Sequence, residues 1–321
     1  MPSNVSRLFR HVVSLPAEAA FHTFNLTPVE KHLYSRHIRE KTEHRLRLPS
    51  LSGLEIEVVD ALKREGVYVT SLNALALPYT DEMTSAGRAI AEGLADGSVG
   101  PRSRSWRSRN GQVAVLESYR ALFRWGLNLS LLRIVEGYLG LPPAYDGPKV
   151  AYTPADGRQV GTRLWHRDRE DRRMMKIAIY LTDVSHDGGP LQCLKSQIYD
   201  GPIDCDFNYP VLSHEELERK LGRNLEESDI VSCTGPVGTV VFMDTARLYH
   251  RGKPAVGIPR QAIFQTYFSR VPRHPFFCER SDLSRSEVTK FAEEISNPQQ
   301  CAAVEWRKDL GWSRLIARSA V

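Results

Sequence analysis

The run Arg-Leu-Trp-His-Arg-Asp at 163–168 contains two side chains that can bind one metal ion, His166 and Asp168. On a β-strand, residues i and i+2 project from the same face. One strand would therefore present an imidazole nitrogen and a carboxylate oxygen to the same ion. A second histidine from elsewhere in the chain would complete a 2-His-1-carboxylate triad, which leaves the remaining coordination positions open.

A second His-x-acid triplet, at 214–216, predicts a helix rather than a metal site. Ser213 and Glu216 have the spacing of a capping box, and Gly222 ends the segment. Residues i and i+2 of a helix do not face each other. About one such triplet is expected by chance in a chain with 10 His and 38 acidic residues. The residues around each triplet must therefore indicate whether it is a metal site.

The elements that follow Asp168 predict a sheet that would position it. Residues 174–181 are typical of a strand and precede a turn at 187–190, Asp-Gly-Gly-Pro. A second strand is predicted at 238–244, shortly before His250. Arg260 opens a further β-like run that extends to Phe268.

This order of parts resembles the phytanoyl-CoA dioxygenase family of Fe(II)/2-oxoglutarate-dependent oxygenases. The resemblance covers about residues 145–270, and the chain departs from the family's frequent Pro-Gly-Ser-His turn at 194–197, Leu-Lys-Ser-Gln. The matching pieces are Trp-His-Arg-Asp at 165–168, Tyr-Leu-Thr-Asp-Val at 180–184, Gly-Gly-Pro-Leu at 188–191, Gly-Thr-Val-Val-Phe-Met-Asp at 238–244, His250 and Arg260.

The resemblance implies that His166, Asp168 and His250 bind Fe(II), with 2-oxoglutarate and O2 at the open positions. Arg260 occupies the family's place for binding the distal carboxylate of 2-oxoglutarate, and guanidinium has the bidentate geometry for it. Tyr180 is a candidate hydrogen-bond donor to the same molecule. Related halogenases replace the carboxylate ligand with a small residue. Retention of Asp168 therefore favours hydroxylation, with desaturation and ring closure left open.

Strand parity adds further candidates. If the apolar side chains of 174–181 pack into a hydrophobic layer, Lys176 and Tyr180 face the opposite way, into the pocket. Lys176 is then a candidate substrate ligand. Trp165 and Arg167 point away from the metal ligands and would support them from behind, which matters to ligand geometry.

Four arginines spaced by serines lie between Gly97 and Gly111. We interpret Arg104 and Arg107 as candidate substrate ligands for an anionic group. A solvated loop is the alternative interpretation. Basic and aromatic residues also alternate in nucleic-acid binders, but one short run in a chain of net charge +5 makes nucleic acid an unlikely partner.

The rest of the chain predicts flanking helices. Amphipathic periodicity indicates helices at 54–65 and 117–139, and Ser284 with Glu287 forms another capping box. The predicted fold is mainly β with flanking α, a double-stranded β-helix (jelly-roll or cupin-like) core with helices packed outside. We expect one oxygenase domain, made of a mostly helical part at 1–145, a core at 146–270 with an insert at 200–229, and a helical extension at 271–321.

Composition excludes several classes of protein. No run approaches 18 apolar residues, and the first 15 residues lack a signal-peptide pattern, so neither a membrane span nor secretion is expected. Five cysteines without Cys-x-x-Cys spacing argue against disulfides and structural zinc. Dinucleotide, phosphate-loop and nucleophile-elbow motifs are missing. We expect a cytoplasmic enzyme whose oligomeric state is open.

The sequence leaves two main hypotheses. The first is an oxygenase acting on a polar or anionic small molecule, in a family that accepts acyl-CoA thioesters, amino acids and secondary metabolites. The second is a cupin-like metal-binding or ligand-binding protein, or an isomerase, without 2-oxoglutarate turnover. Arg260 discriminates between the two hypotheses, because a binding module needs no cation to bind the distal carboxylate of 2-oxoglutarate.

Overall fold

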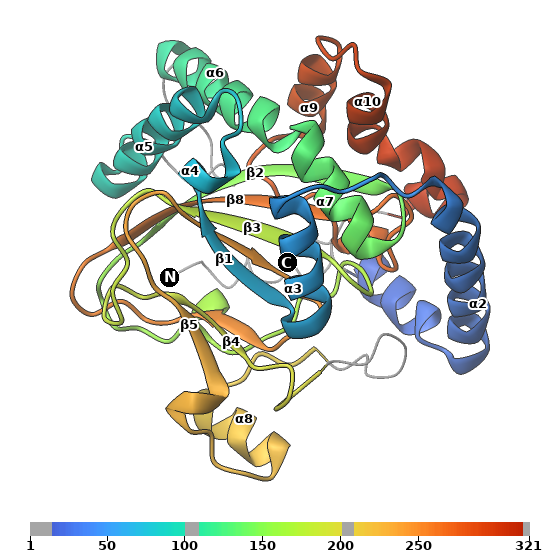
Figure 1. The fold of residues 1–321 in the computed structure, drawn as a ribbon, viewed down its shortest axis with the longest axis horizontal. Helices are drawn as coiled ribbons and strands as arrows, with labels where there is room; N and C mark the ends of the chain where they lie inside the picture. The colour runs from blue at the N-terminus through green and yellow to red at the C-terminus, as the bar shows by residue number, and fades with distance from the viewer. Residues whose placement is uncertain (1–14, 100–108, 201–208, 317–321) are drawn as a thin grey trace.

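Two antiparallel sheets form the centre of the computed structural model, which describes residues 15–99, 109–200 and 209–316. The larger sheet has the strand order β1-β6-β3-β8-β2, and the smaller has the order β5-β4-β7 (Figure 1). The strands are β1 (Val67–Ser71), β2 (Pro143–Thr153), β3 (Met175–Tyr180), β4 (Leu191–Leu194), β5 (Ile230–Cys233), β6 (Thr239–Met243), β7 (His250–Gly252) and β8 (Arg260–Ser269).

The two faces of the larger sheet have different neighbours. On β3, Ile177 and Ile179 join a cluster with the helices, whereas Ala178 and Tyr180 join a cluster shared with β4 and β5 of the smaller sheet. The alternation follows from the two-residue period of a strand. The predicted parity of 176–181 is therefore confirmed, and the space between the sheets is lined by the even-numbered residues of β3.

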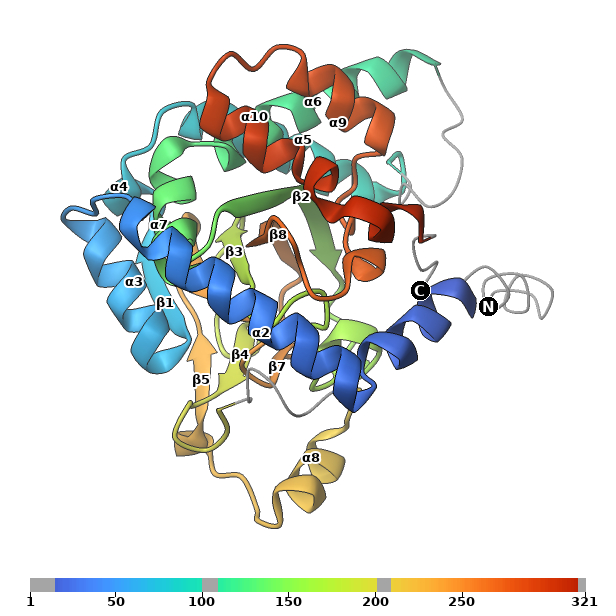
Figure 2. The same cartoon turned by 90° about the vertical axis from the view of Figure 1, so that its right-hand side faces the viewer.

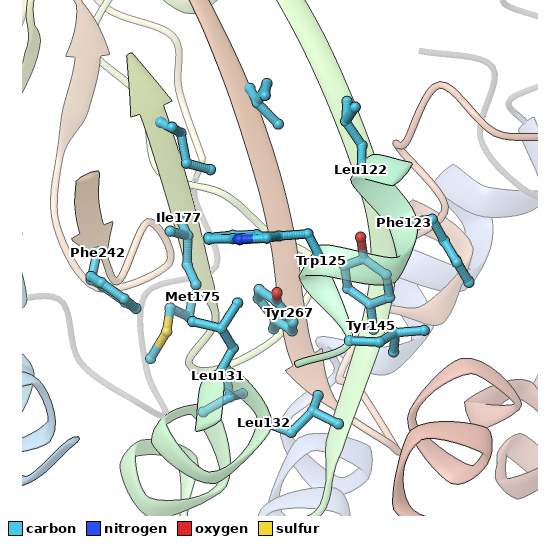
Figure 3. Close-up of a cluster of buried hydrophobic side chains, with 14 of the residues drawn as sticks. Leu122, Phe123, Trp125, Leu131, Leu132, Tyr145, Met175, Ile177, Phe242 and Tyr267 are labelled. Atoms are coloured by element: carbon cyan, nitrogen blue, oxygen red, sulfur yellow. The ribbon is translucent and has the colours of Figure 1, made fainter. Parts of the chain in front are cut away.

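Helices cover the outer face of the larger sheet (Figure 1). Trp125 is completely buried there, and Figure 3 shows it lying among apolar side chains from the strands, with Ile177 and Tyr267 nearby. The helices are α2 (Thr27–His44), α3 (Leu54–Glu65), α4 (Leu72–Leu75), α5 (Thr80–Asp96), α6 (Arg109–Gly126), α7 (Leu129–Leu139), α8 (His214–Leu221), α9 (Arg285–Ala292) and α10 (Pro298–Val304).

The helix predicted at 117–139 is divided into two. α6 ends at Gly126, and α7 begins at Leu129. Between them Asn128 acts as an N-cap, because its side-chain oxygen accepts a hydrogen bond from the backbone N–H of Ser130 at 2.9 Å. The expectation of one long helix was wrong because apolar periodicity continues across a break that Gly126 and Asn128 create.

Sheets and helices thus agree with the predicted two-sheet core and outer helical cover. Across the described residues, however, more residues lie in helices than in strands, so "mainly β" applies only to the core. No helix in the described ranges is long and apolar enough to cross a bilayer.

Part of the predicted insert packs on the outside of the smaller sheet. Its helix α8 has the predicted capping box of Ser213 and Glu216. Leu217 of α8 is completely buried in a cluster with Trp165, Leu194 and Tyr249. The insert therefore covers the strands from behind, and Figure 1 shows α8 at the far end of the molecule from the helical layer.

Helix α2 is joined to the core by a buried carboxylate. Glu30 accepts hydrogen bonds from Arg172 at 2.8 Å and from Arg273 at 2.6 Å. All three side chains are at most 8% exposed. Figure 2 shows α2 running diagonally in front of the strands, so this charge cluster fixes α2 against the segment that follows Asp168.

His274 predicts an acid-sensitive element of stability. Its ring is completely buried, Nδ1 donates to the carbonyl of Arg169, and Nε2 has no hydrogen-bond partner among the described residues. Burial, then the charge of Arg273, lower the pKa of His274 well below its usual value. The unfolded chain binds a proton below about pH 6.5 and the folded chain does not, so the free energy of unfolding falls as pH falls.

We expect His274→Asn, which keeps a donor for the Arg169 carbonyl, to remove this dependence. Between pH 6.5 and 5.5 the wild-type protein should lose about 1 kcal/mol more unfolding free energy than the variant. Urea unfolding at both pH values measures the difference. Equal pH dependence in the two proteins would contradict the assignment.

Candidate metal centre

His166 and Asp168, which are two residues apart, meet the distant His250 between the sheets. His166, Asp168 and His250 each offer a ligand atom, and these atoms all lie within 4.8 Å of one another. The imidazole centroids of His166 and His250 are 4.3 Å apart. The Nε2 atoms lie 4.0 Å (His166) and 3.8 Å (His250) from oxygens of Asp168. It is the one such cluster of potential metal ligands in the described parts of the chain.

The backbone around His166 differs from the predicted strand. His166 pairs with His250 in an isolated antiparallel bridge, in which each residue donates its N–H to the other's carbonyl, at 3.0 and 2.9 Å. Asp168 donates its N–H to Thr245 at 2.8 Å. The two ligands still project together, because the segment is extended even though it belongs to no regular strand.

Hydrogen bonds set the tautomer of both imidazoles. Nδ1 of His166 is 2.8 Å from the carbonyl oxygen of Leu164, and Nδ1 of His250 is 3.1 Å from that of Leu248. A carbonyl only accepts, so each Nδ1 carries the proton. Each Nε2 is then a lone-pair donor on the side where Asp168 lies, as a ligand to a metal requires.

Electrostatics favour the protonation states that bind a metal. Burial, followed by the neighbouring His166, lowers the pKa of His250 to about 3, and burial also lowers the pKa of His166. For Asp168 burial opposes ionisation, but the charge of Lys176 and its hydrogen bond hold the pKa below the usual value. Two neutral imidazoles and one carboxylate fit a divalent first-row metal with open positions.

Lys176 lies beside the cluster on the inner face, as predicted. Its ammonium donates to Oδ2 of Asp168 at 2.5 Å, and its side chain is 26% exposed. The contact orients the carboxylate. Substrate binding by Lys176 stays a prediction.

Arg260 is a buried cation whose contacts are all uncharged. Its side chain donates to the carbonyl of Gly189 and, at 3.4 Å, to the hydroxyl of Thr153. It is 5% exposed, and among the described residues it forms no ion pair with a carboxylate and its Nε has no hydrogen-bond partner. Burial lowers the pKa of Arg260. A buried charge without a counter-ion is costly, so the site is suited to an anion supplied from outside the chain.

Gly252 connects Arg260 to the metal cluster, and the sequence reasoning missed it. A Cβ built on Gly252 would lie 2.7 Å from Nη2 of Arg260. Gly252 is two residues past His250 on β7, so the two residues share a face. The two-residue spacing from His250 could have indicated Gly252 as a site residue from the sequence. The guanidinium therefore lies against the same short strand that carries a metal ligand.

We expect Gly252→Ala to displace the Arg260 guanidinium. Its backbone tolerates alanine, since it is not in the left-handed region, but the added methyl group overpacks the site. If the guanidinium binds 2-oxoglutarate, the dissociation constant of 2-oxoglutarate should rise roughly 10-fold, in line with an overpacking cost of about 1–3 kcal/mol. Co(II) affinity should stay unchanged, and isothermal titration measures both. An unchanged 2-oxoglutarate affinity would contradict the placement.

Tyr180 also faces the space between the sheets. Its hydroxyl donates to the carbonyl of Cys233 at 2.7 Å and accepts from the N–H of Leu191 at 3.1 Å. The proton that the 2-oxoglutarate role would need is thus already donated within the chain. That role stays a prediction.

The remaining site residues are Glu170 and the predicted Arg104 and Arg107. Glu170, absent from the predicted site, is a buried carboxyl whose pKa is raised to about 7 by burial and then by the charge of Asp168. Its two-residue spacing from Asp168 was visible in the sequence. Arg104 and Arg107 lie outside the described residues.

Several solved structures similar to this chain share 12–19% sequence identity with it. The non-haem alpha-ketoglutarate-dependent epimerase SnoN from nogalamycin biosynthesis has a TM-score of 0.41 and 12% identity, over 68% of this chain and 83% of SnoN. EctD from S. alaskensis with bound Fe has a TM-score of 0.45 and 18% identity, over 73% and 82%. The non-haem monooxygenase ThoJ has a TM-score of 0.41 and 12% identity, over 78% and 99%.

SnoN has also been solved with Fe3+ and alpha-ketoglutarate, and EctD with 2-oxoglutarate and 5-hydroxyectoine. No family model matches this chain, and no curated protein matches it. At these identities the similarities assign no activity to the chain.

Proposed function

We propose that this chain is an Fe(II)- and 2-oxoglutarate-dependent dioxygenase with a double-stranded β-helix core, similar to the phytanoyl-CoA dioxygenase family. The observation that carries the proposal is the position of Arg260. Its buried guanidinium lies against Gly252, two residues from the ligand His250, and makes no ion pair with a described carboxylate. A metal triad alone is common to several classes, whereas a nearby buried cation suits a keto diacid.

Each residue has a defined task in this proposal. His166, Asp168 and His250 would hold Fe(II), which when bound supplies the activation of O2 for oxidation of a C–H bond. Arg260 binds the distal carboxylate of 2-oxoglutarate through its planar fork. Lys176 holds the carboxylate of Asp168, and the apolar space between the sheets excludes water.

The outcome of the reaction follows from Asp168. A carboxylate ligand fills the position that a halide needs in related halogenases, so hydroxylation is proposed, with desaturation or ring closure as other hydrogen-abstracting outcomes. The substrate would be a polar or anionic small molecule, for which Lys176, Arg104 and Arg107 are candidate ligands. We propose one domain over 1–321, with its core at 146–270.

The competing function is a cupin-like metal-binding or ligand-binding protein, or an isomerase, that does not turn over 2-oxoglutarate. It accounts for the triad but gives Arg260 no role. Anaerobic addition of Fe(II) and then 2-oxoglutarate separates the two, because chelation by the keto acid gives a weak visible charge-transfer band. A succinate-release screen across anionic small molecules then identifies substrates. An iron-loaded protein that shows no band with 2-oxoglutarate would favour the competing function.

A further inference from the structure

We propose that two cation–π pairs behind the metal cluster, Trp165–Arg251 and Arg167–Tyr249, clamp the two ligand histidines at the separation a metal requires. The inference rests on the proposed metal-binding function and deepens it. The four residues are the chain neighbours of His166 and His250. We call them the clamp, and each acts as a positioning residue through the histidines.

The need for a clamp follows from the weakness of the local sheet. β7 has three residues, and His166 belongs to no strand. The backbone connection between the ligands is one bridge with two hydrogen bonds. A bridge of this size leaves the rotation of one segment against the other poorly restrained, because cross-strand side-chain pairs are the unit of sheet stabilisation.

The register of the bridge places the clamp pairs directly opposite each other. Since His166 and His250 form a hydrogen-bonded antiparallel pair, residue 165 faces 251 and residue 167 faces 249. These are non-hydrogen-bonded positions, where opposing side chains approach most closely. They lie on the opposite face from the imidazoles, so the clamp cannot reach the metal or a substrate.

The first pair combines a buried ring with a half-buried guanidinium. Cζ of Arg251 lies 4.4 Å from the centroid of the completely buried Trp165. Nε of Arg251 also donates to Oε1 of Gln192 on β4 at 2.9 Å. Nε1 of Trp165 donates to Nδ1 of His214 on α8 at 3.3 Å. Both members of the pair are thereby fixed to elements outside the bridge.

The second pair is part of a larger aromatic cage. Cζ of Arg167 lies 5.6 Å from the ring centroid of Tyr249, 5.5 Å from that of Tyr199 and 5.2 Å from that of Tyr209. Arg167 is 5% exposed, so the cation is largely desolvated, a condition that strengthens cation–π attraction. Tyr199 packs edge-on against Tyr249 with centroids 4.8 Å apart.

The clamp also gives residues 209–214 of the predicted insert a role. Leu212 forms a backbone bridge to Trp165 with two hydrogen bonds of 2.8 Å, and His214 and Tyr209 contact the clamp from the same region. This part of the chain would therefore preorganise the metal ligands from behind. These residues lie on the opposite side of the bridge from the imidazoles.

Charge and geometry predict opposite effects for Arg251→Met. Removing a cation near a site for a divalent metal should tighten metal binding if only charge mattered. If the clamp positions the histidines, the same change should weaken Co(II) binding by about 10-fold, the lower end of what loss of an outer-shell partner costs. Arg251→Lys keeps the charge and part of the cation–π contact, and should restore most of the affinity.

The experiment measures the Co(II) dissociation constant and the visible Co(II) spectrum of the full chain, together with the urea unfolding midpoint. Arg219→Met on α8, which removes an exposed arginine of the same region, is the matched control and should bind Co(II) like the wild type. Arg167→Met tests the second pair, and combined with Arg251→Met it should weaken binding by about 100-fold. If Arg167→Met does not fold, Arg251→Met alone decides.

The possible results distinguish failure of the proposed metal-binding function from failure of the clamp alone. A wild-type protein that does not bind Co(II) overturns the proposed function and the clamp with it. A wild-type protein that binds Co(II), with Arg251→Met binding equally well or more tightly, overturns the clamp alone. Weaker binding by Arg251→Met at an unchanged unfolding midpoint, with recovery in Arg251→Lys, supports it.

Discussion

Asp168→Ala should abolish metal binding. The variant loses the only anionic member of the triad and leaves Lys176, whose ammonium is 2.5 Å from that carboxylate, without its ion-pair partner beside the site. We expect Co(II) and Fe(II) affinity to fall by more than about 100-fold, since loss of an outer-shell partner already costs about 10–100-fold. Succinate release should fall to background, because turnover of 2-oxoglutarate needs the bound metal. Titration with Co(II) and a succinate assay measure the two effects.

The second His-x-acid triplet offers a matched control. Glu216→Ala removes a carboxylate at the same spacing from His214, but on α8, where it belongs to a capping box. That change should cost about 1 kcal/mol of stability and leave metal affinity unaltered. Retention of Co(II) binding by Asp168→Ala within about 10-fold of the wild type would show that the triad is not the metal site.

Arg260→Met should remove 2-oxoglutarate binding while leaving the metal in place. Truncating one partner of a buried, hydrogen-bonded charge pair costs about 2–5 kcal/mol, so the dissociation constant of 2-oxoglutarate should rise at least about 30-fold. Arg260→Lys keeps the charge but loses the fork, and should recover only part of the affinity. The charge-transfer band of the Fe(II) complex, followed against 2-oxoglutarate concentration under anaerobic conditions, reports the affinity.

The appropriate control for Arg260→Met is an exposed arginine. Arg158, with 70% of its side chain exposed, pairs with Asp156, and Arg158→Met should bind 2-oxoglutarate as the wild type does. Unchanged affinity in Arg260→Met would remove the observation that carries the proposed function and would favour a binding protein or isomerase.

Local periodicity made much of the fold predictable. The helix at 54–65, with its terminal glycine, and both capping boxes depend on residues within one or two turns. The parity of 176–181 was predictable for the same reason, since it follows from the two-residue period of a strand. The two-residue spacing of His166 and Asp168 is likewise a local feature, so the sequence alone could place the two side chains together.

The remaining features depend on contacts between distant residues. Nothing near His166 in the sequence indicates His250. The resemblance supplied the expectation that His250 is the third metal ligand, and the backbone bridge between the two histidines was not predicted. The strand predicted at 166 is absent because the segment forms single isolated bridges, Trp165 with Leu212 and His166 with His250, rather than a continuous ladder. The environment of Arg260 is formed by Thr153, Gly189 and Gly252 from three separate segments, so its burial without a carboxylate could only be seen in the structure.

The shared carboxylate of Glu30 limits where this protein can be shortened. It is the link through which α2 neutralises Arg172 and Arg273, and Arg172 follows Asp168 by four residues. A truncated protein that starts after α2 would keep both guanidinium groups in the interior and lose the acid that faces them. Helix α2, which carries none of the proposed chemistry, is therefore a structural requirement for the segment that does.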